Sequence, residues 1–224
     1  MSAKTTHKNL DKFSDINLAA VALLANDIGY HLGVIYRNNG ATTTKVIHLA
    51  WHHRLKDEPT TEVWAWVPSD IDTDRLADAA ALCRLIARNP AKKKAPYGFE
   101  FGDSGIDAKG AVFIGGSSVG LTCATFVLAL FRRIGIELLD VSTWKQRPDD
   151  EKAWETLFAS LKETKGIDPK HLTALENQKK CMRYRPEEVA ASSSVGPWPM
   201  PFDLAVVAGK NIEDYILRVD TPQA

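Results

Sequence analysis

Residues 30–50 read YHLGVIYRNNGATTTKVIHLA, and this stretch decides the fold of the 224-residue chain. Two runs rich in apolar and β-branched residues, 31–36 and 44–51, flank an asparagine-asparagine-glycine turn signal. That pattern predicts a β-hairpin. Pairing across the turn would bring His31, which opens the first strand, beside His48 in the second.

The sequence around this hairpin predicts a mixture of helices and further strands. Helices are expected over 16–28, from 68–70 to about 86, and over 121–134, 149–165 and 169–180, with a short last one from 185. Strands are expected over 62–67, 97–101, 110–114, 202–207 and 215–219. This mixture indicates the α+β class. With no internal repeat and no interdomain linker, residues 15–224 are expected to form one domain after a loose N-terminus, 1–14.

Charge and cysteine content argue against several classes of protein. The 28 Lys and Arg residues balance 28 Asp and Glu residues, so no nucleic-acid partner is expected. The three cysteines, Cys83, Cys123 and Cys181, are an odd number without a CxxC pair, which argues against a disulfide framework and a zinc site. Free thiols of this kind favour the reducing cytoplasm, and no cofactor is expected.

The apolar stretches are too short to span a bilayer. The longest, 18–25 and 124–130, fall far short of the roughly 20 residues that a spanning helix needs. Residues 1–12 lack the apolar region of a secretory signal. Neither an integral membrane segment nor a secretory signal is therefore expected.

Cys123 follows a loop of small residues and begins an apolar helix. Unpaired amides and the helix dipole stabilise a thiolate at such a position, and the same amides can donate to an oxyanion. A free cysteine is also commonly a small buried hydrophobe. Position alone leaves both interpretations open.

A nucleophilic cysteine needs a base, and the six histidines offer few candidates. His7 and His171 lie in polar surroundings, whereas His31 and His48 meet across the predicted hairpin. Each of these two, taken alone, also fits a structural role. A metal site at 48, 52 and 53 lacks an acidic or cysteine partner, so no metal is expected.

Three segments carry a resemblance to a known family. Residues 30–36, 46–50 and 122–127 resemble the permuted branch of the papain-like NlpC/P60 superfamily, whose best-known members are the lecithin:retinol acyltransferase-like proteins. In that branch the histidine strand precedes the cysteine helix in the chain. Residues 185–189 resemble a Pro-Glu/Asp segment of bacterial permuted members. The resemblance implies a papain-like α+β fold, in which an antiparallel sheet packs against the cysteine-bearing helix.

The resemblance also implies roles for single residues. Cys123 would be the nucleophile, His31 the general base, and His48 the polar group that orients His31. Beside them, Tyr30, Trp51 and Thr122 are expected to bind substrate. The tryptophans at 51, 64 and 66 either line an apolar cleft or pack on a half-buried sheet.

The expected function is a cysteine hydrolase that cleaves an amide, peptide or ester bond through a thioester. One alternative is an acyltransferase or phospholipase of the lecithin:retinol acyltransferase type. Another is a catalytically inactive papain-like binding module, because Thr122 and Ala124-Thr125 replace the family's Asn and Glu-His. The charged helical stretch 137–182 has no counterpart in the family, and we expect it to be an insertion that builds a substrate lid or a partner surface.

Overall fold

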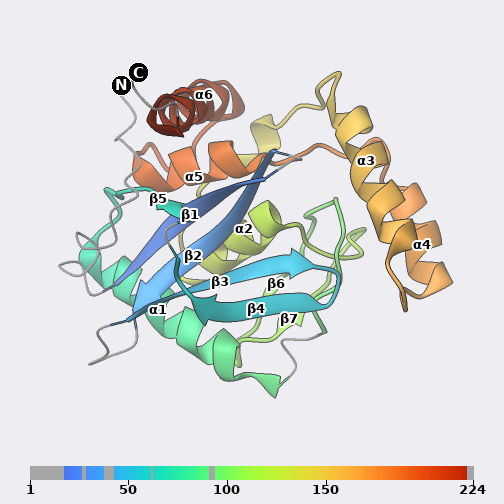
Figure 1. The fold of residues 1–224 in the computed structure, drawn as a ribbon, viewed down its shortest axis with the longest axis horizontal. Helices are drawn as coiled ribbons and strands as arrows, with labels where there is room; N and C mark the ends of the chain where they lie inside the picture. Colours follow the sequence, from blue (N-terminus) through green and yellow to red (C-terminus); the bar gives the residue numbers. More distant parts are fainter. Residues whose placement is uncertain (1–17, 27–28, 38–42, 62, 91–93, 221–224) are drawn as a thin grey trace.

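The computed structural model describes residues 18–26, 29–37, 43–61, 63–90 and 94–220. These residues form an α+β fold around a five-stranded antiparallel sheet of order β4-β3-β2-β1-β5 (Figure 1). Its strands are β1 (Ala19–Asn26), β2 (Gly29–Arg37), β3 (Thr44–Trp51), β4 (Arg54–Pro59) and β5 (Ala65–Trp66). A separate two-stranded sheet pairs β6 (Gly105–Ile106) with β7 (Val112–Phe113).

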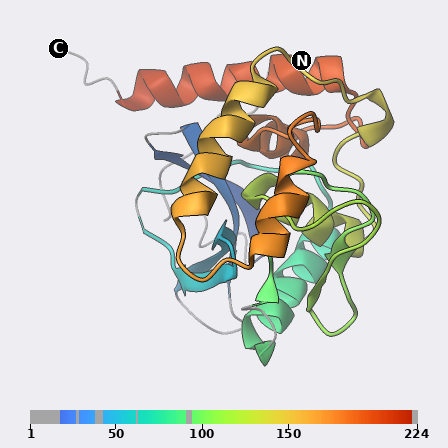
Figure 2. The same ribbon diagram turned by 90° about the vertical axis from the view of Figure 1, so that its right-hand side faces the viewer.

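Helices cover the sheet and extend to one side of it. They are α1 (Thr73–Arg88), α2 (Cys123–Arg133), α3 (Asp150–Glu163), α4 (Pro169–Glu176), α5 (Pro186–Ser194) and α6 (Phe202–Asp220), with a 3₁₀ turn η3 (Val141–Thr143). Helix α2, which begins at Cys123, packs against β2 and β3, and α5 packs between the sheet and α6. Figure 2 shows α3 and α4 side by side as a separate pair of helices. The expected packing of an antiparallel sheet against the cysteine helix is therefore present.

The predicted hairpin is confirmed. β2 and β3 pair antiparallel, with Val34 opposite Ile47 and Arg37 opposite Thr44. Its turn, 38–42, and the expected loose N-terminus, 1–14, lie outside the described residues. β3 then continues into β4 through a tight turn at His53, which adopts a positive φ of 54°. The sequence pattern had not predicted β4.

The expected helix over 16–28 is wrong for its described part, which is strand β1. Its alternate residues face two different apolar clusters: Ala19, Val21 and Leu23 join the main core, whereas Ala20 and Ala22 pack with Trp64 and Trp66. A strand buried on both faces has a continuous apolar sequence. Periodicity cannot distinguish such a run from a buried helix.

The two strands expected over 202–207 and 215–219 are also wrong, because both segments belong to helix α6. Its buried residues are Phe202, Ala205, Gly209, Ile212 and Ile216, spaced by three or four positions. That spacing places them on one face of a helix. Val207, between them, points outward and is 62% exposed, whereas Val206 is partly buried against the core.

The remaining expected elements are mostly confirmed, with shorter bounds. α1 buries the predicted apolar face, which includes Leu76, Cys83 and Ile86. The strand expected over 62–67 shrinks to β5, and the one over 97–101 to a single parallel bridge between Tyr97 and Leu121. In the described part of the chain, no helix is long and apolar enough to cross a membrane.

Candidate active site

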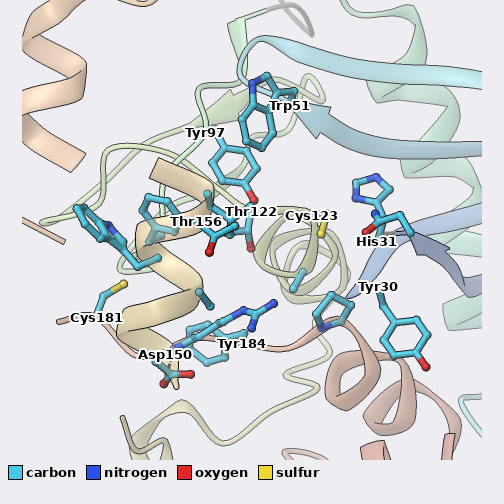
Figure 3. A pocket seen from close by; sticks show the side chains of 18 of the residues that line it. Tyr30, His31, Trp51, Tyr97, Thr122, Cys123, Asp150, Thr156, Cys181 and Tyr184 are labelled. Carbon is cyan, nitrogen blue, oxygen red and sulfur yellow. Dashed lines mark hydrogen bonds between the residues drawn. The ribbon is translucent and has the colours of Figure 1, made fainter. Parts of the chain in front are cut away.

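A cavity of about 410 Å³ lies where β2, the start of α2 and the segment around α3 meet (Figure 3). Five of the six predicted site residues line it: Tyr30, His31, Trp51, Thr122 and Cys123. His48 does not line the cavity and lies behind His31. Further lining residues come from other segments: Asn26, Ala50, Tyr97, Phe99, Ala124, Asp150, Ala153, Trp154, Thr156, Leu157, Cys181, Arg183, Tyr184 and Pro186.

Cys123 is the first residue of α2, and a reciprocal pair of threonines fixes that helix start. Thr122 Oγ1 accepts from the Thr125 amide at 3.1 Å, and Thr125 Oγ1 accepts from the Thr122 amide at 2.7 Å. This is a capping box, which satisfies two amides that the helix itself leaves unpaired. Thr122 and Thr125 are two of the positions that depart from the family pattern, and here they have a structural role.

The loop before Cys123 is held by a close crossing of two chain segments. A Cβ atom on Gly98 would lie 2.4 Å from the Gly120 amide nitrogen, and one on Gly120 would lie 2.4 Å from the Tyr97 carbonyl carbon. Only glycine permits this approach. Backbone hydrogen bonds from Leu121 to Pro96 at 3.0 Å and from Gly98 to Leu121 at 3.3 Å join the two segments. The segment that carries Tyr97 is thereby fixed beside the cysteine.

The Cys123 thiol is buried, with 8% of the residue exposed. Burial raises its pKa, while the nearby backbone amides of Leu32 and Ala124 and the charge of Arg183 oppose that rise. Burial therefore favours the neutral thiol over a standing thiolate.

A chain of hydrogen bonds runs from His31 through His48 to a carboxylate. His31 Nε2 lies 2.7 Å from His48 Nδ1, and His48 Nε2 lies 3.0 Å from Glu58 Oε1. Gly33 makes room for this pair, since a Cβ there would lie 3.0 Å from His48 Cβ. The imidazole rings cross at 76° with their centroids 4.9 Å apart.

The charge of Glu58 sets the proton positions along this chain. Burial alone would raise the pKa of Glu58, but the hydrogen bond from His48 and the charges of His48 and Lys56 outweigh it and lower the pKa. An ionised carboxylate only accepts, so His48 Nε2 carries the proton and Nδ1 accepts from His31 Nε2–H. A neutral His31 then has an unprotonated Nδ1, which is the form that a general base requires.

Both imidazoles are neutral near pH 7. Burial, followed by the charge of His48, lowers the pKa of His31 to about 4. Burial also lowers the pKa of His48, although Glu58 opposes that shift. The site therefore combines a neutral thiol with a neutral imidazole.

Cys123 and His31 share the cavity without a hydrogen bond between them, since no described contact joins the thiol to either ring nitrogen. Figure 3 shows the sulfur of Cys123 directed toward the strand that carries His31. The Leu32 amide, one residue after His31, is close enough to the sulfur to affect its pKa. Hydrogen bonds of this kind are often long in unliganded enzymes and shorten when substrate binds.

The three tryptophans divide between the two expected roles. Trp51 lines the cavity, packs against Tyr97 with the ring centroids 4.8 Å apart and the planes tilted by 41°, and donates from Nε1 to Thr164 Oγ1 at 2.8 Å. Trp64 and Trp66 are buried in the smaller apolar cluster. The Trp64 ring lies 5.2 Å from that of His48, so it packs against the histidine pair rather than against substrate.

Sequence reasoning missed Glu58 and Arg183. Glu58 lies on β4, beside His48 on the neighbouring strand, and the register puts it opposite Val46. No alternation in the sequence marks this strand, because residues 54–59 read RLKDEP and Leu55 is their one large apolar side chain. Nothing local marks Arg183, which follows α4 in an irregular segment.

The comparisons with other proteins identify no relative. Family models, curated proteins and solved structures give no significant match to this chain. Within the described ranges, no group of three or more His, Cys, Asp or Glu side chains is arranged to hold a metal ion.

Proposed function

We propose that this chain is a cysteine hydrolase of the permuted papain-like type, which cleaves an amide, peptide or ester bond. One observation carries the proposal: the His31–His48–Glu58 chain ends at an imidazole that shares a cavity with Cys123 at the start of a helix. Nucleophile, base and orienting group thus come together from three separate elements.

In the first half of the reaction, His31 Nδ1 takes the thiol proton as Sγ attacks the substrate carbonyl carbon. The Cys123 amide at the start of α2 donates to the oxyanion. The carbon–nitrogen or carbon–oxygen bond then breaks, and His31 passes its proton to the leaving amine or alcohol. A thioester on Cys123 remains.

In the second half, a water molecule attacks the thioester while His31 removes a proton from that water. The carbon–sulfur bond breaks, the acid leaves, and His31 returns the proton to the thiolate. An amine or hydroxyl acceptor in place of water would make the same site an acyltransferase. His48 keeps the His31 ring in one tautomer and orientation throughout, and Glu58 does the same for His48.

The segment 137–182 supports the idea of a lid over this site. Asp150, Trp154 and Cys181 belong to it and line the cavity, and the Trp51–Thr164 hydrogen bond ties it to β3. A cover of this kind excludes water and holds substrate against the nucleophile.

Selective alkylation tests the proposal. Iodoacetamide at pH 7, with peptide mapping by mass spectrometry, is expected to label Cys123 at least tenfold faster than Cys83 or Cys181. Burial raises the pKa of both control thiols, that of Cys181 to about 12, and among the described residues no histidine is in contact with either. Cys123→Ala should remove the labelling and leave the fold intact.

Equal labelling of Cys123 and Cys181 would contradict the proposal. It would also favour the alternative of a catalytically inactive binding module, since a thiol without an effective base reacts only in proportion to its own ionisation.

A further inference from the structure

Three arginines, Arg147, Arg183 and Arg185, lie near the cavity, and they differ in their partners. Arg147 makes ion pairs with Glu188 and, at 3.5 Å, with Asp150. Arg185 pairs with Asp149 at 2.6 Å. The guanidinium of Arg183 has no hydrogen bond or ion pair to any described residue, although Arg183 lines the cavity together with Cys123.

The backbone of Arg183 is fixed while its side chain is left without a partner. Its amide donates to Asp150 Oδ2 at 3.4 Å, and its carbonyl accepts from Trp144 Nε1 at 3.0 Å and from Arg147 Nη2 at 2.7 Å. A partly buried guanidinium carries five donors, and the desolvation of such a charge is costly without a partner. A fixed backbone and a guanidinium without an ion pair suit an arginine whose side chain binds a ligand.

Among the described residues that line the cavity, Arg183 is the one lysine or arginine. The one lining carboxylate, Asp150, is occupied by Arg147 and by two backbone amides. In Figure 3 its carboxylate lies at the far side of the cavity from Cys123. Arg183 is therefore the one lining cation without an ion pair to a described residue, among aromatic walls that include Tyr97, Phe99 and Trp154.

The field of Arg183 extends over this part of the site. It acts to lower the pKa of Cys123 and of Tyr97, whose own burial raises both. It also acts to lower the pKa of Glu187, a buried carboxyl whose pKa burial raises. No ion pair joins Glu187 to Arg183, so the guanidinium stays available to a ligand.

We propose that Arg183 binds a carboxylate of the substrate, so that the hydrolase cleaves acyl compounds or short peptides that carry a free carboxylate near the scissile bond. This inference rests on the proposed function of Cys123. One arginine matches a monoanion, and its planar fork pairs with both carboxylate oxygens. The carboxylate belongs either to a free C-terminus or to an acidic side chain.

Matched alkylating reagents test this without a known substrate. The two acids are iodoacetate and N-iodoacetylglycine, and each is compared with its neutral amide, iodoacetamide or N-iodoacetylglycinamide. For at least one pair, the acid is expected to alkylate Cys123 roughly tenfold faster than the amide, about the gain of one charge-assisted hydrogen-bond pair. Arg183→Met should abolish that ratio, whereas Arg185→Met, which alters the arginine paired with Asp149, should preserve it.

A competition experiment on the unaltered protein covers the case in which Arg183→Met fails to fold. N-acetylglycine offers a terminal carboxylate, and the α-amide of N-acetylglutamate offers a side-chain carboxylate. At least one is expected to protect Cys123 from iodoacetamide at lower concentration than N-acetylglycinamide does, and the better protector identifies the source of the carboxylate.

The outcomes separate the inference from the proposed function. One outcome would overturn only the role of Arg183 and leave the proposed function standing. In it, iodoacetamide labels Cys123 fast and selectively, neither acid reagent reacts faster than its amide, and neither acid protects better. An acid preference that survives in a folded Arg183→Met protein would overturn that role as well. Slow, unselective labelling by every reagent would overturn the proposed function and the inference with it.

Discussion

Two regions of the molecule build the site in different ways. In the β2–β3–β4 region, the three groups His31, His48 and Glu58 lie within 28 residues of sequence and are aligned by strand pairing. The segment that begins just before α3 and ends in α5 forms a wall of the cavity. Ion pairs between Arg147 and Glu188 and between Arg185 and Asp149 hold this wall in place. In the proposed mechanism, the strand region controls the proton positions, while the helical region determines which substrates bind beside them. Variants in the first should change the rate of chemistry, and variants in the second the affinity for substrate.

The largest effect is expected in the strand region, at the base. His31→Ala should slow alkylation of Cys123 and substrate turnover by roughly 10²- to 10⁴-fold, because general-base catalysis typically contributes that much. His48→Gln should lower both rates about tenfold, since an amide can still accept from His31 Nε2–H but holds the ring less firmly. The single-turnover rate measures both. Equal losses in the two variants would show that His48 acts as more than an orienting group.

A smaller effect is expected from the tie between β3 and the helical region. Trp51→Phe removes the Nε1 donor to Thr164 while keeping most of the ring contact with Tyr97. Loss of one hydrogen bond of about 1 kcal/mol should raise KM roughly fivefold and leave the alkylation rate by iodoacetamide unchanged. Thr164→Val is the matched variant, and the double substitution should add nothing further. An unchanged KM with a lower kcat would contradict the assignment of substrate affinity to the helical region.

The smallest effect is expected at Glu58. Its side chain is 40% exposed, and two hydrogen bonds separate it from His31, the proposed base. Glu58→Gln keeps an acceptor but removes the charge, so turnover should fall only about threefold. Without the carboxylate, the pKa of His48 should fall further, because Glu58 now raises it. Histidine NMR titrations would measure that shift. A pKa of His48 that rises in this variant would contradict the proton positions assigned along the chain.

The sequence predicted the strand region of the site because its signals are local. The turn residues and the two apolar runs predicted the hairpin, and the hairpin register brings His31 beside His48. The loop of small residues before Cys123 and the apolar run after it likewise predicted α2. β1 was mistaken for a helix because both its faces are buried. The local sequence around α6 indicated strands, whereas its burial pattern is helical.

The other half of the site depends on tertiary structure that no local pattern reveals. Nothing in the local sequence indicates that Arg147 is paired and that the Arg183 guanidinium has no ion pair to a described residue; only the folded chain shows this difference. Tyr97 reaches Cys123 through the crossing at Gly98 and Gly120, where sequence predicted a loop with a short strand. Sequence reasoning identified the cavity residues of the strand region better than those of the helical region.

The pH profile of Cys123 alkylation by iodoacetamide, measured from pH 3.5 to 9 and compared with that of His31→Ala, tests the central claim most directly. A base whose pKa is lowered to about 4 stays unprotonated down to that pH. The rate in the unaltered protein should therefore be nearly flat above pH 5 and fall near pH 4. In His31→Ala it should be low and rise about tenfold per pH unit, as for an unassisted thiol. Identical rising profiles in the two proteins would contradict the pairing of Cys123 with His31.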